Sequence, residues 1–129
     1  MPFRLELTSV FSAAHAILIR GSREPLHGHD WRVTLTIEGS TLDADGLLVD
    51  FHAVEAALKA IIAPFHNRSL NETTPFNVTN PTAELVAKYI GGGIEAWLAT
   101  DAAAAARGIR LAQVRITEAV GCAAVYIPV

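Results

Sequence analysis

Three of the five histidines in this 129-residue chain stand at positions where they could act together. His27 and His29 are separated by one residue, at the entry to a run in which apolar and polar residues alternate. Alternation with a period of two is typical of a half-buried β-strand, and it places both imidazoles on the face that carries Trp31 and Val33. His15 ends an earlier strand-like segment, and it comes beside the other two histidines if the segments pair as antiparallel neighbours.

Imidazoles on a buried face need a partner, and a metal ion satisfies several of them as neutral ligands. Three histidines with one open position form the catalytic kind of zinc site, whereas a structural site is more often closed by cysteines. The sequence therefore predicts a zinc site at His15, His27 and His29. The alternative is that these are ordinary hydrogen-bonded histidines.

Residue patterns also predict the strands that must position these side chains. Four strands are expected, at residues 3–11, 29–39, 109–117 and 122–128. The last two are joined by a short hairpin at Val120 and Gly121. Residues 18–26 are expected to form a loop, and residues 66–79 to lack regular structure.

Two amphipathic helices are expected between the two pairs of strands. The first begins with Asp50 as its N-cap and carries apolar residues at steps of three and four, with Pro64 near its end. The second is expected to begin with Asn80 as cap and Pro81 at the first helical position. Three glycines at 91–93 inside it indicate either close packing against another backbone or a break in the helix.

The order ββααββ describes one α+β domain over residues 1–129, with a four-stranded antiparallel sheet and two helices on one face. A single sheet has two open edges. In addition, 51% hydrophobic residues is a high fraction for so small a domain. Both features predict a homo-oligomer in which sheets join across subunits.

Bulk composition excludes several classes of partner. The formal net charge is −3 and no basic cluster appears, so a nucleic-acid partner is not expected. No apolar run approaches the ~20 residues that span a membrane, and no signal-peptide pattern is visible. The single cysteine, Cys122, excludes an intrachain disulfide and fits a reducing compartment, so a cytoplasmic protein is expected.

Six short motifs occur in order along the chain: Phe11-Ser-Ala-Ala-His15, Leu26-His-Gly-His29, Gly46-Leu-Leu-Val-Asp50-Phe51, Leu70-Asn71, Asn80-Pro-Thr-Ala-Glu84, and Glu118 followed by Gly121-Cys122. In this order they resemble the family of 6-pyruvoyltetrahydropterin and 6-carboxytetrahydropterin synthases, which has the tunnelling fold. The resemblance covers nearly the whole chain. It implies zinc on the three histidines, a pterin anchored by Glu118, and sheets joined into a barrel. It further implies trimers that stack into hexamers, with sites at subunit interfaces.

Glu118 also stands out by its position. It ends the apolar stripe of Val114 and Ile116 on a predicted strand. An ionised carboxylate can accept two parallel N–H donors, which suits the 2-amino-4-oxo-pyrimidine edge of a pterin. The alternative is a surface acid at the end of a strand.

Two regions depart from the family pattern. The family's catalytic cysteine, four residues before the HxH motif, corresponds to Arg23, which is followed by Glu24. An Asp-His pair before the family's Leu-Asn corresponds to His66 and Asn67. The resemblance therefore implies that the zinc ligands are kept while the usual proton-transfer triad is replaced.

The catalytic base then stays open between His66, Glu24 and a zinc-bound hydroxide. Imidazole is a common base near neutral pH, which favours His66. The alternative interpretation is that His66 is a solvated loop residue. Glu24 is a second candidate because it lies in the loop beside the predicted ligands. Arg23 either contacts a substrate phosphate or is solvated.

The resemblance and these residues together predict a zinc-dependent lyase of the pterin synthase type. It would act on 7,8-dihydroneopterin triphosphate or a related pterin by breaking a carbon–oxygen or carbon–carbon bond, with a product that the altered triad can change. The alternative is a pterin-binding homologue without synthase activity, and a third interpretation is a structural zinc domain. The pathway stays open between queuosine, biopterin and folate.

Overall fold

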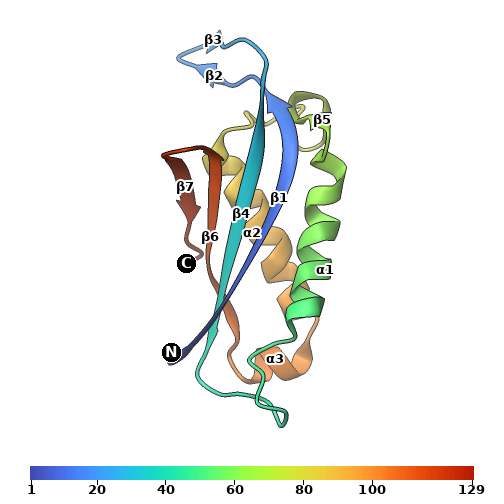
Figure 1. Ribbon diagram of the computed structural model, residues 1–129, viewed down its shortest axis with the longest axis vertical. Helices are drawn as coiled ribbons and strands as arrows, with labels where there is room; N and C mark the ends of the chain where they lie inside the picture. The colour runs from blue at the N-terminus through green and yellow to red at the C-terminus, as the bar shows by residue number, and fades with distance from the viewer.

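A computed structural model describes residues 1–129 as a long sheet covered by helices (Figure 1). The main sheet contains, in spatial order, β5 (Arg68–Ser69), β1 (Phe3–His15), β4 (His27–Gly39), β6 (Arg110–Ala119) and β7 (Cys122–Tyr126). A separate hairpin consists of β2 (Leu18–Ile19) and β3 (Ser22–Arg23). The helices are α1 (Phe51–Ile62), α2 (Ala83–Ala99) and α3 (Ala102–Ala106), with 3₁₀ turns at Ala63–Phe65 and Leu70–Glu72.

The antiparallel pairing of β1 with β4 extends over the whole of both strands. Phe3 lies opposite Gly39 at one end, and His15 lies opposite His27 at the other. Alternation along β4 completely buries Trp31, Val33, Leu35 and Ile37, whereas His27 and His29 on the same face are partly buried. The pairing expected from the sequence is confirmed, and both strands extend beyond the predicted ranges far enough to include all three histidines.

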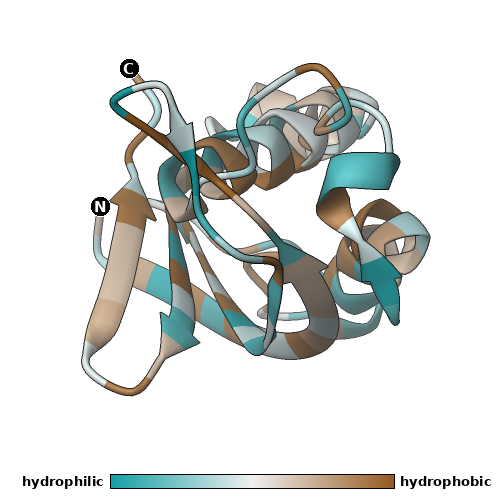
Figure 2. Ribbon diagram, turned by 90° about the horizontal axis from the view of Figure 1, so that it is seen from above, coloured by the Kyte–Doolittle hydropathy of each residue, from teal (hydrophilic) through white to brown (hydrophobic).

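The helices form a second layer on one face of the sheet, as the view from above shows (Figure 2). α2 packs against β6 and β7, and α1 packs against β1 and α2. The core between the layers is one continuous apolar cluster. The α+β fold with helices on one face is thus confirmed. No helix is long and apolar enough to cross a membrane.

The predicted start of α1 is confirmed, whereas that of α2 is wrong. The Asp50 side chain caps α1 by accepting from the His52 amide. At α2 the cap is Thr82, whose hydroxyl accepts from the Leu85 amide. Asn80 is not available as a cap because its amide is bonded to the backbone of Leu18.

The glycine run leaves α2 unbroken, so the predicted alternative of a helix break is wrong. A Cβ on Gly91 would lie 2.7 Å from the ring of Tyr126, and one on Gly93 would lie 2.8 Å from Ile61. Close packing is confirmed, although against side chains of β7 and α1 rather than against another backbone. Gly92 faces open space.

Two segments predicted to lack regular structure contain short elements. Residues 18–26 include the β2–β3 hairpin, and residues 66–79 include β5 and a 3₁₀ turn. β5 adds a fifth, parallel strand to the sheet through Ala13 and Ala14 of β1. These short elements depend on tertiary pairing rather than on a repeating apolar pattern, and periodicity alone did not reveal them.

Candidate metal and pterin site

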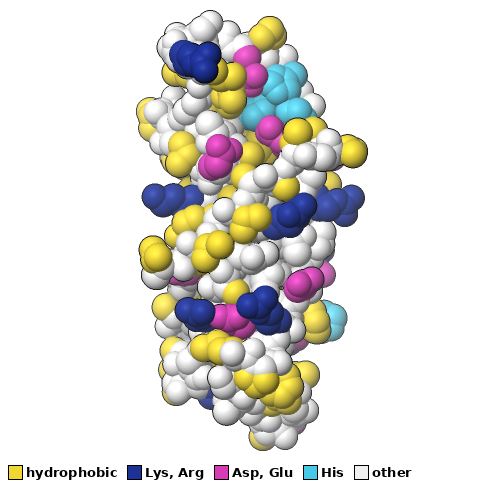
Figure 3. Space-filling view, turned by 90° about the vertical axis from the view of Figure 1, so that its left-hand side faces the viewer, with side chains coloured by type: hydrophobic (Ala, Val, Ile, Leu, Met, Phe, Trp, Pro, Cys, Tyr) yellow, Lys and Arg dark blue, Asp and Glu magenta, His cyan; other side chains and the backbone are white.

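The three histidines meet where β1 ends and β4 begins. One donor nitrogen from each of His15, His27 and His29 lies within 4.8 Å of the others. Figure 3 shows the histidine side chains gathered at the upper end of one face, with acidic side chains beside them. The His15 residue is 1% exposed, so the cluster has a buried side and an accessible side.

Backbone carbonyls fix the orientation of two of the rings. His15 Nδ1 lies 2.8 Å from the carbonyl oxygen of Pro81, and His27 Nδ1 lies 2.9 Å from that of Pro25. A carbonyl can only accept, so each Nδ1 carries the proton and each Nε2 presents a lone pair. This second contact is typical of histidines that bind metal ions.

Three buried side-chain atoms of the chain lack a hydrogen-bond partner, and all belong to this site. They are Nε2 of His15, Nε2 of His29 and Oε2 of Glu118. Buried polar atoms without a partner are costly, so an outside group is expected to satisfy them. Imidazole nitrogens and a carboxylate oxygen are ligands of zinc, and the residues present therefore fit the ion.

Burial favours the neutral form of His29. Burial lowers the pKa of His29 from its usual 6.5, and the nearby Glu118 carboxylate opposes this effect. The neutral imidazole is the form that binds a metal ion.

Trp31 forms a rigid wall beside the cluster. Its ring stacks on Phe11 with centroids 5.8 Å apart, and its Nε1 donates to the carbonyl of Ala13 at 3.1 Å. The rings of His15 and His29 meet it edge-on, at 4.8 and 5.8 Å. The core thus restricts the rotamers of both histidines.

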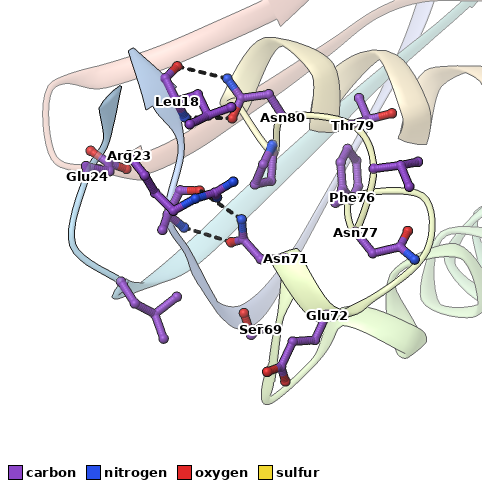
Figure 4. A pocket seen from close by; sticks show the side chains of 14 residues that line it. Leu18, Arg23, Glu24, Ser69, Asn71, Glu72, Phe76, Asn77, Thr79 and Asn80 are labelled. Carbon is purple, nitrogen blue, oxygen red and sulfur yellow. Dashed lines mark hydrogen bonds between the residues drawn. The ribbon is translucent and has the colours of Figure 1, made fainter. Parts of the chain in front are cut away.

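Two asparagines hold the chain that follows His15. The Asn71 amide accepts from the Ala16 N–H and donates to the Ala16 carbonyl, both at 2.8 Å. Asn80 makes the same pair of bonds to Leu18. Both amides point at the segment after β1 (Figure 4). No local pattern in the sequence indicates these contacts, although both asparagines belong to the six motifs.

Arg23 and Glu24, at the end of the β2–β3 hairpin, both bond to the backbone that follows β1. Arg23 Nη1 donates to the carbonyl of Ala16 at 2.9 Å, so this side chain is bonded to protein rather than only to solvent. Glu24 Oε1 accepts from the Ile17 N–H at 3.1 Å and lies 3.7 Å from His27 Nε2. Both residues line a cavity of about 460 Å³ (Figure 4).

Glu118 lies on β6, within reach of the cluster. Its Oε2 is 3.4 Å from His15 Nε2, and its side chain is 27% exposed. The structure therefore brings Glu118, from β6, and Glu24, from the loop after β3, to the three histidines.

His66 lies elsewhere in the chain. It is exposed, and its Nδ1 accepts from the Ser12 N–H at 3.2 Å, at the outer edge of β1. Asn67 has a φ of +58° and donates from its backbone to the Ser12 carbonyl. No contact joins His66 to the cluster within the chain.

The fold and site define an α+β protein with a three-histidine cluster that could hold a metal ion. The family model described as 6-pyruvoyl tetrahydropterin synthase matches residues 4–128. The chain belongs to this family.

Curated relatives and solved structures agree with this assignment. A 6-carboxy-5,6,7,8-tetrahydropterin synthase of Bacillus subtilis is 33% identical over 104 residues, covering 76% of this chain and 69% of the relative. A putative enzyme of the same name from Archaeoglobus fulgidus is 26% identical, covering 87% and 84%. The solved 6-pyruvoyl tetrahydropterin synthase of Caenorhabditis elegans superposes with a TM-score of 0.81 at 18% identity, covering 98% and 96%. The tunnelling fold is thus confirmed for the single chain.

Proposed function

We propose that this protein is a zinc-dependent pterin synthase-type enzyme that acts on 7,8-dihydroneopterin triphosphate or a related pterin. The carrying observation is the convergence of all three unpartnered buried side-chain atoms, from His15, His29 and Glu118, at one site. A site with no chemistry to perform has little reason to bury lone pairs in this way.

His15, His27 and His29 would hold the zinc ion through their Nε2 atoms. Two of the rings are oriented for this by backbone carbonyls. Zinc held there supplies Lewis-acid chemistry toward the hydroxyl-bearing side chain of a pterin. The chain's own residues must then bind the ring and move the protons.

Glu118 is proposed as the pterin anchor. Its carboxylate is partly exposed at the cluster, and Oε2 has no partner within the chain. Two carboxylate oxygens can accept from the 2-amino group and the ring N–H of a pterin.

Glu24 is the better supported of the two proposed base residues. Its carboxylate lies at the cluster and is oriented by the Ile17 amide. The related 6-pyruvoyltetrahydropterin synthase of Plasmodium vivax has been solved with its catalytic residue, a glutamate, replaced by alanine and by cysteine. A glutamate in such a role therefore has a precedent within this fold. His66 is the second candidate, because it is exposed and its Nδ1 already accepts from the Ser12 N–H.

The altered triad supports a product that differs from the usual one of the family. A base at a different position from the family's thiolate would reach a different proton of the side chain, and a different bond would then break. Loss of the carbon–carbon bond of the side chain and elimination of phosphate each need only a Lewis acid and one base.

We further propose that the protein assembles into trimers or hexamers. β7 has a neighbour on one side only, and β1 meets β5 only at its last residues. Antiparallel pairing of these two open edges between copies would close a barrel and remove both edges. Sedimentation velocity tests this, and a monomer at micromolar concentration would contradict it.

The enzyme proposal is tested by giving zinc-loaded protein 7,8-dihydroneopterin triphosphate and following the products by mass. Glu24→Gln is expected to lower kcat by about 10²–10⁴-fold, the usual contribution of a general base. His66→Ala tests the second candidate, with His52→Ala as the control because His52 is also exposed.

Each outcome separates the alternatives. Loss in His66→Ala but not in Glu24→Gln would assign the base to His66. Absence of turnover, together with pterin binding that Glu118→Ala abolishes, would identify a binding protein instead.

A further inference from the structure

We propose that the Glu118 carboxylate is a fourth ligand of the metal in the substrate-free protein, and that a bound pterin draws this carboxylate away. The inference rests on the proposed function, because it gives a second task to the residue proposed as the pterin anchor.

Glu118 and His15 contact each other through two atoms that lack other partners. Oε2 and Nε2 lie 3.4 Å apart, and both are buried without a partner. His15 Nδ1 already carries the proton that it donates to Pro81, so Nε2 presents a lone pair to an oxygen that also has only lone pairs. Two such atoms repel each other unless a cation lies between them.

The separation of the two atoms fits a metal ion between them. Bonds of about 2.1 Å at the tetrahedral angle place neighbouring zinc ligands about 3.4 Å apart, which is the separation of the two atoms. A shared proton would satisfy His15 and Glu118 but would leave Nε2 of His29 without a partner. A metal ion satisfies all three atoms at once.

Glu24 offers a contrast within the same site. Its Oε1 is 3.7 Å from His27 Nε2 but already accepts from the Ile17 amide. It is therefore not among the unpartnered atoms, whereas Oε2 of Glu118 is.

The consequence is a site that stays closed until substrate arrives. A carboxylate oxygen bound to a cation is a weaker acceptor for the N–H groups of a pterin, so the two tasks of Glu118 compete. Engagement of the pterin edge then frees the coordination position where the substrate side chain must act. Binding of the pterin ring by Glu118 would thereby open the fourth coordination position of the metal.

The experiment uses full-length protein loaded with Co²⁺ in place of zinc and follows the visible absorption of the metal during titration with azide. Wild-type protein is expected to bind azide weakly, because Glu118 occupies the open position. Glu118→Gln is expected to bind azide at least about tenfold more tightly, the usual scale for changes at a metal site. Glu72→Gln is the control, because Glu72 is an exposed carboxylate in the wall of the neighbouring cavity, and this variant is expected to resemble wild type.

A second measurement needs no variant. Unsubstituted pterin, which has the recognition edge but no side chain, is added to wild-type Co²⁺ protein before azide, and its binding is followed by fluorescence. Bound pterin is expected to tighten azide binding by a similar factor.

Equal azide affinity in wild type and Glu118→Gln would overturn the proposal, as would bound pterin without any effect on azide. If Glu118→Gln does not fold, the pterin measurement decides. Failure of the proposed function has a different signature, since a wild-type protein with no Co²⁺ absorption bands would lack the metal site itself.

Discussion

At the scale of single residues, the site depends on side chains that never touch a ligand. Asn71 and Asn80 bond to Ala16 and Leu18 in the way a neighbouring strand would, so the chain leaves β1 in an ordered conformation. Pro81, next to Asn80, supplies the carbonyl that orients His15. The two asparagines thus help to fix the position of His15 from two loops that are distant in sequence.

Replacement of Asn71 by alanine tests this role. The change leaves the N–H and the carbonyl of Ala16 without that partner, and two lost bonds cost about 2 kcal/mol in free energy of unfolding. Zinc affinity should fall as well, because His15 loses a fixed neighbour. Urea unfolding and competition with a chromophoric chelator measure both. Asn77→Ala, in the same cavity wall but exposed, should change neither quantity.

The sequence predicted the histidines but not their supports, for a physical reason. The positions of His15 and His29 follow from alternation and from one strand pairing, which are local patterns. The bonds of Asn71 join residues that are 55 positions apart, and no local pattern encodes them. The contact of Glu118 with His15 likewise depends on the register of β6 against β4, which no composition rule sets.

At the scale of elements, two of the three glycines in α2 are needed for close packing, and Gly92 is not. Gly91 admits the rigid ring of Tyr126, and Gly93 admits the flexible end of Ile61. The sequence predicted close packing here but could not distinguish the three positions, because their neighbours come from β7 and α1. Asn80 was assigned as a helix cap because capping is a local preference that tertiary bonds to Leu18 override.

Alanine substitutions in the run should therefore differ in sign. Gly92→Ala is expected to raise the free energy of unfolding by up to about 1 kcal/mol, since it removes backbone freedom without any new contact. Gly91→Ala is expected to lower it, because Tyr126 must move. Thermal and urea unfolding of the two variants check this pair. A stabilising Gly91→Ala would show that the ring is not held against the helix.

On the open face of the sheet, Glu38 connects three strands. Its carboxylate accepts from Arg110 of β6 at 2.8 Å and from Arg4 of β1 at 3.2 Å, and the residue is 5% exposed. The hydrogen bond from Arg110, followed by the charges of both arginines, lowers the pKa of Glu38 below its usual 4.5. These two ion pairs connect β1, β4 and β6 at the end of the sheet far from the histidines.

A carboxyl whose folded pKa is lowered contributes stability above its unfolded pKa and loses it as the pH falls through the folded value. Glu38→Gln should therefore be less stable than wild type at pH 7, and the difference should shrink as the pH falls below 4.5. Urea unfolding across this range measures it. Glu55→Gln, which breaks an exposed pair with Lys59, should show little effect at any pH. A constant difference for Glu38→Gln would mean that its charge is not the cause.

At the scale of the whole molecule, the site lies where independent parts of the chain meet. His15 ends β1, His27 begins β4, Glu118 lies on β6, and Glu24 follows the small hairpin. A metal ion there would join the ends of these elements as a crosslink would. Binding should therefore be visible in global stability and not only in catalysis.

Zinc is expected to stabilise the folded protein because the unfolded chain does not bring these ligands together. Free zinc at about 100 times the Kd adds about 2.7 kcal/mol to the free energy of unfolding. For a chain of this size that raises the Tm by roughly 10 °C. Calorimetry with zinc and with a chelator measures the shift, and His27→Asn should abolish it. Since His27 is partly exposed, this variant should keep the Tm of the metal-free wild type. An equal zinc shift in His27→Asn would mean that the stabilising ion is bound elsewhere.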